Sequence, residues 1–582
     1  GAATAAALLL GVVGRMALLG DPAAPDASGG TVALSGSPDS RDPRKHLTSV
    51  APRTGEPVPH GDPTAGPMPQ PAKVKDALGL VERRALRLRE GRPANGFLGP
   101  VGGEDALPEG YSAEEYASLQ DNPFLRVGQE PLSTFSIDVD TASYANVRRF
   151  LASGQVPPAD AVRVEELVNY FRYDYEPPRD GAPFSVQVEA HKAPWAPKHH
   201  LVRIGLRAID VSIADAPASN LVFLVDVSGS MGEENKLPLV KRSLRLLVEQ
   251  MRRQDSLSLV TYAGQSGLLL PPTPGDRKAE ILEAIDRMGA GGSTNGAAGI
   301  QEAYRVAQEN MREGGINRVL LCTDGDFNVG ASSEGELSRL IEEKRASGVF
   351  LSVLGFGRGN YADARMQALA QKGNGNAAYI DSFSEAKKVL VEQATGTLLT
   401  IAKDVKIQIE FNPAHVAGYR LIGYENRMLQ AQDFNDDTKD AGEIGAGHSV
   451  TALYEVIPAG VEVPGGDVDP LKYQKPPVVE GNPSAELFTV KLRYKKPDGD
   501  VSEKIEVPYT PAAAEVEPSA DFHFASSVAA FGMLLRNSPH KGTANWGLVE
   551  ELGKGGLGRD PEGWRKEFVE LVKTARGLAE TK

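Results

Sequence analysis

The sequence predicts a doubly wound, Rossmann-like α/β domain with a mainly parallel sheet. An α+β segment precedes it, and an antiparallel β domain with terminal helices follows it. Two patterns support this fold class. Between residues 216 and 399, short apolar runs rich in Val and Leu alternate with amphipathic helical stretches. After residue 400, strands of alternating polarity are separated by turns rich in Gly, Pro and Asp. The first pattern is typical of parallel strands buried on both faces, and the second is typical of antiparallel strands.

The residues before the folded region differ in composition. The segment Ala2–Leu19 is almost entirely apolar and long enough for a marginal membrane span or the remnant of an export signal, with a buried core helix as the alternative. We therefore interpret residues 1–20 as an anchor or signal remnant and residues 21–110 as a linker rich in Pro and Gly. The first basic residue downstream of the apolar segment is Arg41, which indicates a non-cytoplasmic side.

Residues 111–215 form the N-terminal α+β region. The segment Leu132–Leu151 predicts a strand, a loop and then a helix. A helix with one apolar face is expected within Val162–Phe171, and alternating strands are expected at Phe184–Val188 and His200–Ile209.

The α/β domain is assigned to residues 216–399. Its expected strands are at 221–225, 256–262, 318–323 and 349–356. Its expected helices are Leu237–Met251, Lys278–Met288, Ala297–Met311 and Glu334–Ala346. A domain of this class binds ligands beyond the carboxyl ends of its strands.

Residues 400–582 form the C-terminal β-rich domain with terminal helices. Strands are expected at 405–411, 419–424, 450–457, 487–494 and 503–509, and helices from Phe522 onward.

Length and charge narrow the classes of function. A chain of 582 residues predicts roughly two to four domains. The formal net charge of −14 argues against a nucleic-acid partner, because nucleic-acid binding normally depends on a positive surface. The single cysteine, Cys322, excludes an internal disulfide and a cysteine-based zinc site.

Three loops that follow predicted strands carry oxygen-bearing side chains. They read Asp226-Val-Ser228-Gly-Ser230, then Gly-Gly-Ser-Thr294, then Thr-Asp324-Gly. Carboxylates and hydroxyls that converge at one sheet edge suit a hard cation, Mg²⁺ or Mn²⁺, before Zn²⁺. The alternative is that these groups only cap the helices that follow.

The same residues resemble the metal-ion-dependent adhesion site of von Willebrand factor type A (vWA) domains. From about Asn122 to the C-terminus, stretches such as VEELVNYFRYDY and YRLIGYENR resemble a bacterial vWA family of the YfbK type. The resemblance implies that Ser228, Ser230 and Thr294 contact the metal. It further implies that Asp226 and Asp324 act directly or through water, and that an acidic group of a partner completes the coordination.

The expected function is therefore binding, not catalysis. We expect an adhesion- or scaffold-type module that presents Mg²⁺ or Mn²⁺ to a carboxylate of a partner protein. We place it at the cell envelope on the periplasmic side, with residues 2–19 as a candidate membrane tether. A passive scaffold with a structural metal is one alternative. A metal-dependent hydrolase with Asp324 or Asp326 as base is the other, but no nucleophile with a partner base is visible and no His lies in these loops.

Other polar clusters receive simpler interpretations. Asp138-Val-Asp140-Thr141 is similar to the loop of phosphoryl-transferring aspartate enzymes, but Ala142 stands where threonine is needed, so a strand end followed by a helix N-cap is expected. The histidines between residues 191 and 200 lack zinc-ligand spacing. The acidic run Asp433–Asp440 lacks the pattern of a calcium loop and predicts a solvated turn.

Overall fold

The computed structural model describes residues 116–581 except 264–266, 293–295, 326–333, 358–362, 394–395, 397, 440, 466–483, 498 and 512–515. The predicted anchor and the Pro/Gly-rich linker, residues 1–110, lie outside the described residues. The described residues belong to one compact unit that spans Asp105–Lys582.

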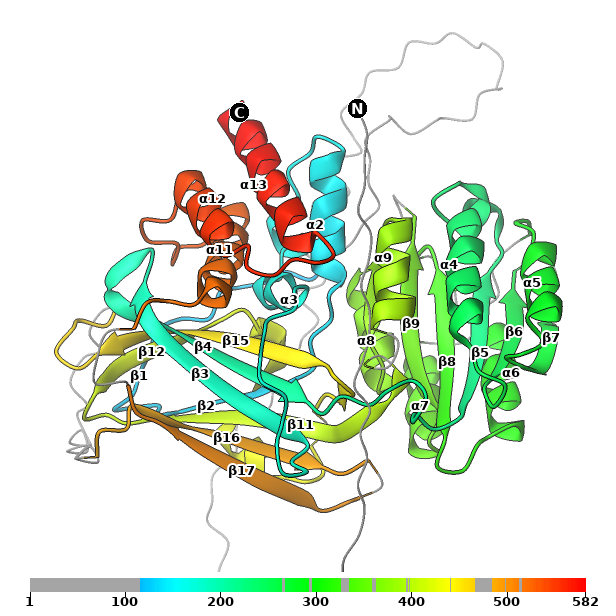
Figure 1. Ribbon diagram of the computed structural model, residues 1–582, viewed down its shortest axis with the longest axis horizontal. Helices are drawn as coiled ribbons and strands as arrows, with labels where there is room; N and C mark the ends of the chain where they lie inside the picture. The colour runs from blue at the N-terminus through cyan, green and yellow to red at the C-terminus, as the bar shows by residue number, and fades with distance from the viewer. Residues whose placement is uncertain are drawn as a thin grey trace, which may run out of the picture. The chain divides into compact units, whose positions relative to one another are not determined.

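An α/β sheet of six strands forms the central part of the chain (Figure 1). Its strands are β5 (Ser219–Asp226), β6 (Ser256–Tyr262), β7 (Gly267–Pro274), β8 (Ile316–Thr323), β9 (Phe350–Phe356) and β10 (Ala377–Ile380). Their order is β10-β9-β8-β5-β6-β7, and every neighbouring pair is parallel except β6 and β7. The predicted doubly wound α/β fold is confirmed. The edge strands β7 and β10 were not predicted from the sequence.

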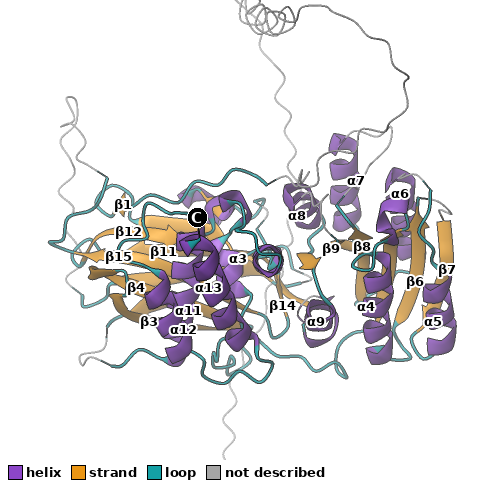
Figure 2. Ribbon diagram, turned by 90° about the horizontal axis from the view of Figure 1, so that it is seen from above, coloured by secondary structure: helices purple, strands orange, loops and turns teal. Residues whose placement is uncertain are grey.

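Helices cover both faces of this sheet (Figure 2). They are α4 (Leu237–Gln250), α5 (Lys278–Arg287), α6 (Gly296–Glu309), α7 (Glu334–Ala346), α8 (Asp363–Lys372) and α9 (Phe383–Lys387), which continues as a π-helical turn, Lys388–Glu392. Along β5, Phe223 faces the core with α4 and α5, whereas Leu224 faces the core with α6, α7 and α8. A strand buried on both sides needs apolar residues throughout, which explains the unbroken run at 221–225.

Two antiparallel sheets pack face to face into a β-sandwich. One sheet has the order β1 (Leu125–Arg126), β12 (Val416–Ile422), β15 (Ser449–Pro458), β4 (Ala196–Ala208), β3 (Phe184–Ala193). The other has the order β13 (Met428–Leu429), β2 (Leu132–Ser136), β11 (Thr400–Phe411), β16 (Phe488–Lys495), β17 (Ser502–Tyr509), with β14 (Ile444–Gly445) paired to β11. Residues such as Ile204 of β4 and Ile407 of β11 meet in one shared core.

The sandwich is built from both ends of the folded chain. Strand β4 pairs with β15, and β2 pairs with β11, so each sheet combines strands from residues 111–215 with strands from residues 400–582. The α/β domain is therefore an insertion between β4 and β11. This interleaving was not anticipated from the order of elements along the sequence, because pairing over such separations leaves no local pattern.

A helical layer covers the outer face of the sheet that contains β15. Its members are α2 (Ala142–Ala152), α3 (Val164–Asn169), α11 (Ala520–Leu535), α12 (Trp546–Gly555) and α13 (Trp564–Glu580). Single helical turns complete the structure at Ala159–Ala161, Gly229–Gly232, Glu425–Arg427 and Ala431–Asn435. The helical layer again combines segments from before and after the insertion.

Buried ion pairs join this layer to the inserted domain. The guanidinium of Arg163, which precedes α3, contacts both carboxylate oxygens of Asp363 on α8 at 2.5 and 3.0 Å. Arg148 on α2 contacts both oxygens of Asp381 at 2.9 and 2.5 Å. Bidentate pairs of this kind fix orientation as well as charge.

Candidate metal centre

The candidate site lies where the strand order of the α/β sheet reverses. Strand β5 has β6 and then β7 on one side and β8 on the other, so the chain crosses to the opposite side of β5 after β7. Asp226 ends β5, and Asp324 directly follows β8. At such a switch point, the loops after the two strands diverge and leave a crevice at the carboxyl edge. The sheet therefore brings these two predicted carboxylates to the same carboxyl edge, at two adjacent strands.

The loop after β5 turns its two serines toward one another. The backbone N–H of Ser228 donates to Oδ1 of Asp226 at 2.8 Å, and the hydroxyls of Ser228 and Ser230 lie 3.0 Å apart. Ser228 is buried, whereas Ser230 is exposed at the surface. The four predicted side chains that the structure describes thus come from two neighbouring loops, and the loop of Ser230 opens to solvent.

The Gly-rich loop is attached to the same place. The N–H of Gly291 donates to the carbonyl of Val227 at 2.7 Å, and the N–H of Gly229 donates to the carbonyl of Gly292 at 3.4 Å. These bonds hold the third predicted loop beside the first. Thr294, the predicted ligand of this loop, and Asp326 lie outside the described residues.

Asp226 is a buried carboxylate with an unfavourable environment for its charge. It is 0% exposed, and Tyr262 donates its hydroxyl to Oδ2 at 3.0 Å. Burial, with a smaller contribution from the like charge of Asp324, raises the pKa of Asp226, although the hydrogen bonds from Ser228 and Tyr262 oppose this. A nearby cation would remove that penalty.

One cation is already present, and no sequence pattern pointed to it. Lys236 precedes α4, and its side chain is only 3% exposed. Its ammonium donates to Oδ2 of Asp324 at 3.2 Å and to the backbone carbonyl of Ser230 at 3.0 Å, and it lies 3.4 Å from Oε1 of Glu233. Gly357, at φ +85°, leaves room for the stem of Lys236, because a Cβ there would lie 2.4 Å from its Cε.

The residues present fit a hard divalent cation. The donor set combines the carboxylates of Asp226 and Asp324 with the hydroxyls of Ser228 and Ser230, all of which are oxygen ligands. No group of three or more His, Cys, Asp or Glu side chains suited to a metal occurs among the described residues, so a carboxylate cage or a zinc-type site has no support there. Only two of these ligands carry a negative charge. A divalent cation bound by them would therefore still attract an oxygen ligand from outside the protein.

The other polar clusters that the sequence pointed to have ion-pair or hydrogen-bond partners within the protein. Asp138 and Asp140 pair with Arg427 at 3.0 and 3.3 Å, and Thr141 is the N-cap of α2 without a side-chain capping bond. The helix start was predicted correctly. The two aspartates pair with Arg427, and Oδ1 of Asp140 also accepts from the backbone N–H of Ala377.

Two of the three histidines, and the acidic turn, have partners of the same kind. His191 contacts Glu189 at 3.0 Å, and His199 contacts Glu455 at 2.6 Å. In the acidic turn, Oδ1 of Asp437 accepts from Arg493 and Ser502. Asp440 lies outside the described residues.

Comparisons with known proteins agree with this architecture. Residues 220–393 match the family described as von Willebrand factor type A domain, residues 396–578 match that described as Uncharacterized protein YfbK, C-terminal, and residues 111–203 match that described as von Willebrand factor. The chain is 45% identical to YfbK of Escherichia coli (strain K12) over 473 residues, which cover 80% of this chain and 81% of that protein.

Two more distant similarities cover less of the chain or share less sequence. Inter-alpha-trypsin inhibitor heavy chain H3 of Pongo abelii is 29% identical over 31% of this chain and 22% of its own length. A solved von Willebrand factor type A protein of Catenulispora acidiphila covers 69% of this chain and 91% of its own, at 14% identity and a TM-score of 0.38. With the inserted α/β domain and the long match to the Escherichia coli protein, the chain belongs to the YfbK family of bacterial vWA proteins.

Proposed function

We propose that the inserted vWA domain is a metal-ion-dependent protein-binding module that presents Mg²⁺, or Mn²⁺, to a carboxylate of a partner protein. One observation carries the proposal. Asp226, Ser228, Ser230 and Asp324 approach one another at the switch point of the sheet, with Ser230 on the surface. In this proposal these residues hold the ion, and Thr294 contributes from the adjoining loop.

The charge of the centre favours an acidic partner. With the ion bound, its two charges and the ammonium of Lys236 face the buried carboxylates of Asp226 and Asp324. The third carboxylate near Lys236, that of Glu233, is 63% exposed, so the buried part of the centre has an excess of positive charge. A carboxylate is the group that such a centre attracts most strongly, and its oxygen can enter the coordination shell at the solvent-facing side. The chain as a whole is acidic, so recognition depends on this local charge and not on long-range steering.

The experiment is a thermal melt of the full chain in Mg²⁺ and in EDTA. A ligand that binds only the folded state raises the melting temperature by mass action, so Mg²⁺ raises it and Asp226→Ala abolishes the difference. Asp276→Asn, at an exposed residue that precedes α5, is the matched control and keeps the wild-type response. Identical wild-type melts in the two buffers refute the proposal. Partner capture in Mg²⁺ that is lost both in EDTA and with Asp226→Ala tests the binding role.

No observation favours the hydrolase alternative. Among the described residues, the polar neighbours of the two aspartates are hydrogen-bond donors such as Tyr262 and Lys236. Neither forms the pair of nucleophile and base that hydrolysis would use.

We also propose a cell-envelope location on the extracytoplasmic side, supported by the apolar sequence of Ala2–Leu19. Within the described residues, none of the helices combines the length and apolar character that a bilayer crossing requires. Cell fractionation of the full chain, compared with a variant that lacks this segment, tests the location. Recovery of both in the cytoplasm contradicts it.

A further inference from the structure

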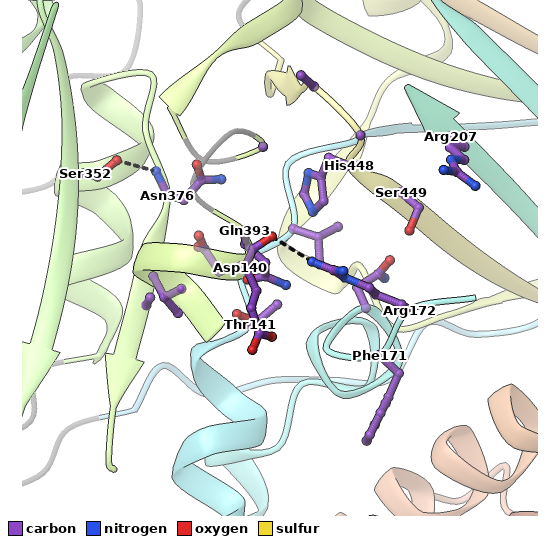
Figure 3. A pocket seen from close by; sticks show the side chains of 18 of the residues that line it. Asp140, Thr141, Phe171, Arg172, Arg207, Ser352, Asn376, Gln393, His448 and Ser449 are labelled. Atoms are coloured by element: carbon purple, nitrogen blue, oxygen red, sulfur yellow. Dashed lines mark hydrogen bonds between the residues drawn. The ribbon is translucent and has the colours of Figure 1, made fainter. Parts of the chain in front are cut away.

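A cavity of about 310 Å³ lies where the inserted domain joins the sandwich (Figure 3). Its walls come from all three parts of the chain. Thr141 and Arg172 precede the insertion, Asn376 belongs to it, and His448 and Ser449 follow it. It is distinct from the candidate metal centre, because it lies at the sheet edge formed by β9 and β10 and contains none of the predicted metal ligands.

Each carboxylate in the wall has a cation close to it. Asp140 lies 3.3 Å from Arg427, which Asp138 shares at 3.0 Å, Asp210 lies 2.7 Å from Arg207, and Oε1 of Glu392 lies 3.0 Å from Lys387. Oε2 of Glu392 has no hydrogen-bond partner among the described residues. An anion in the cavity would therefore have to bind to cations that are not already held in such pairs.

Arg172 is a cation without such a partner. Its guanidinium is exposed and donates to the backbone carbonyl of Glu392 at 2.9 Å. Across the described residues, no carboxylate forms an ion pair with it. The charge of Arg172 and burial together lower the pKa of His448 to about 4, with burial as the larger cause. His448 is therefore neutral at pH 7 and offers one hydrogen-bond donor and one acceptor.

A second guanidinium, that of Arg318, lines a small void together with His448. Arg318 is 2% exposed, and its Nε has no hydrogen-bond acceptor among the described residues. It donates to Oγ of Ser352 at 2.7 Å, and Glu443 is the carboxylate whose charge acts on it. Arg318 lines a void that offers about 10 Å³ to the centre of a water molecule, roughly what one water needs, and this void shares Asn376 and His448 with the larger cavity. Buried donors that lack acceptors attract an anion or the water that accompanies it.

We propose that this cavity binds a small organic anion, with Arg172 as its charged anchor and His448 and Asn376 as neutral hydrogen-bonding neighbours. A guanidinium pairs with carboxylate or phosphate oxygens through two parallel hydrogen bonds. At about 30 Å³ for each water in the liquid, the volume corresponds to roughly ten waters, and hence to an anion of roughly ten to fifteen non-hydrogen atoms.

Because of where the cavity lies, a bound anion would contact the connections between the inserted domain and the sandwich. The turn before β15 binds both connections of the inserted domain: the N–H of Gly447 donates to Ile209 at 2.8 Å, and the N–H of Ala446 donates to Leu399 at 2.9 Å. Both residues of this turn line the cavity. A bound anion therefore contacts the point where the chain enters and leaves the vWA domain, and it ties that domain to the sandwich.

The test is calorimetric titration of the full chain with citrate and, in a second arm, with inorganic phosphate, at constant ionic strength set with NaCl. We expect at least one of the two anions to bind and to raise the melting temperature. Arg172→Gln weakens binding by about tenfold or more, since it removes a charge-assisted hydrogen bond, and Arg172→Lys retains part of the affinity. Because Arg172 is exposed, these variants are expected to fold.

The matched control is Arg179→Gln, which removes an exposed arginine of the same region that pairs with Glu176 outside the cavity wall. Its affinity stays at the wild-type value if the effect is specific. Binding of citrate alone identifies a carboxylate site, and binding of phosphate alone identifies a phosphate site. If neither anion binds, or if Arg172→Gln binds as tightly as the wild type, the inference is overturned. EDTA does not alter any of these results, which separates this site from the metal centre.

Discussion

Replacement of Lys236 by methionine is the most informative perturbation of the candidate metal centre. Methionine keeps an unbranched stem beside Gly357 but removes the ammonium that contacts Asp324 at 3.2 Å. At an effective dielectric constant of about 20, two unit charges at this separation attract by about 5 kcal/mol. Loss of one partner from a buried pair typically destabilises a protein by about 3–5 kcal/mol. Without divalent ions, Lys236→Met should therefore destabilise the vWA domain by about 3 kcal/mol.

Mg²⁺ should reverse most of this loss, because a divalent ion held by Asp226 and Asp324 supplies the missing positive charge. Removal of the ammonium also removes its repulsion for the ion. The increase in melting temperature caused by Mg²⁺ should therefore be larger in Lys236→Met than in the wild type. For a domain of this size, a change of about 3 kcal/mol corresponds to a shift of roughly 6–12 °C.

Differential scanning calorimetry of the full chain, in EDTA and in excess Mg²⁺, measures both effects. Lys241→Met is the matched control, since it makes the same substitution within α4 at a half-buried lysine whose ammonium donates to the backbone carbonyl of Asp286. It should change neither melt appreciably. A smaller Mg²⁺ response in Lys236→Met than in the wild type would refute the reasoning, because it would mean that Lys236 supports the site and does not compete with the ion.

Three other predictions concern buried ionisable groups. Burial, followed by the charges of Glu425 and Glu166, raises the pKa of Glu165 from 4.5 to about 7. The wild type should therefore lose stability as pH rises from 4.5 to above 7, and Glu165→Gln, which has no charge, should gain about 3 kcal/mol of unfolding free energy relative to it. Urea unfolding, followed by the fluorescence of the buried Trp195, measures this difference. Equal pH profiles of variant and wild type would contradict this. Arg163→Met should cost about 3–5 kcal/mol, since it leaves buried carboxylates without their cation, and urea midpoints within error of the wild type would argue against it. The thiol of Cys322 is buried and its pKa is raised, so a thiol reagent should label it only after unfolding; fast labelling of the native chain would contradict this.

Local pattern was enough to locate the vWA domain and most of its candidate site. The strands at 221–225 and 318–323 are unbroken apolar runs, and Asp226 and Asp324 stand at their ends. The edge strand β7 was missed because its sequence, GLLLPPTP, contains three prolines. Prolines are tolerated on an edge strand, where the missing N–H faces no neighbour, but in a sequence they read as a loop.

Lys236 and the sandwich could not be predicted because each depends on distant pairing. In the sequence, Lys236 is one charged residue among several before a helix, a setting that favours exposure. Only the adjacency of β5 and β8 brings Asp324 beside it. Likewise, β2 pairs with β11 through residues such as Phe135 and Ile407, which are far apart in the chain. Each strand was identifiable from its alternation, but its partner was not.

The interleaved topology means that the vWA domain should be studied within its own chain. In an isolated domain, Asp363 and Asp381 would lose the guanidinium groups of Arg163 and Arg148, which hold them at the junction with the helical layer. The two carboxylates are 2% and 10% exposed in the whole chain, so excision would present unpaired charges and an apolar face to water. A metal or partner affinity measured on residues 216–399 alone would therefore combine the property of the site with the loss of this junction. Measurements on the full chain, compared with Arg163→Met, separate the two, because that variant weakens the junction and leaves Asp226, Ser228 and Lys236 unchanged.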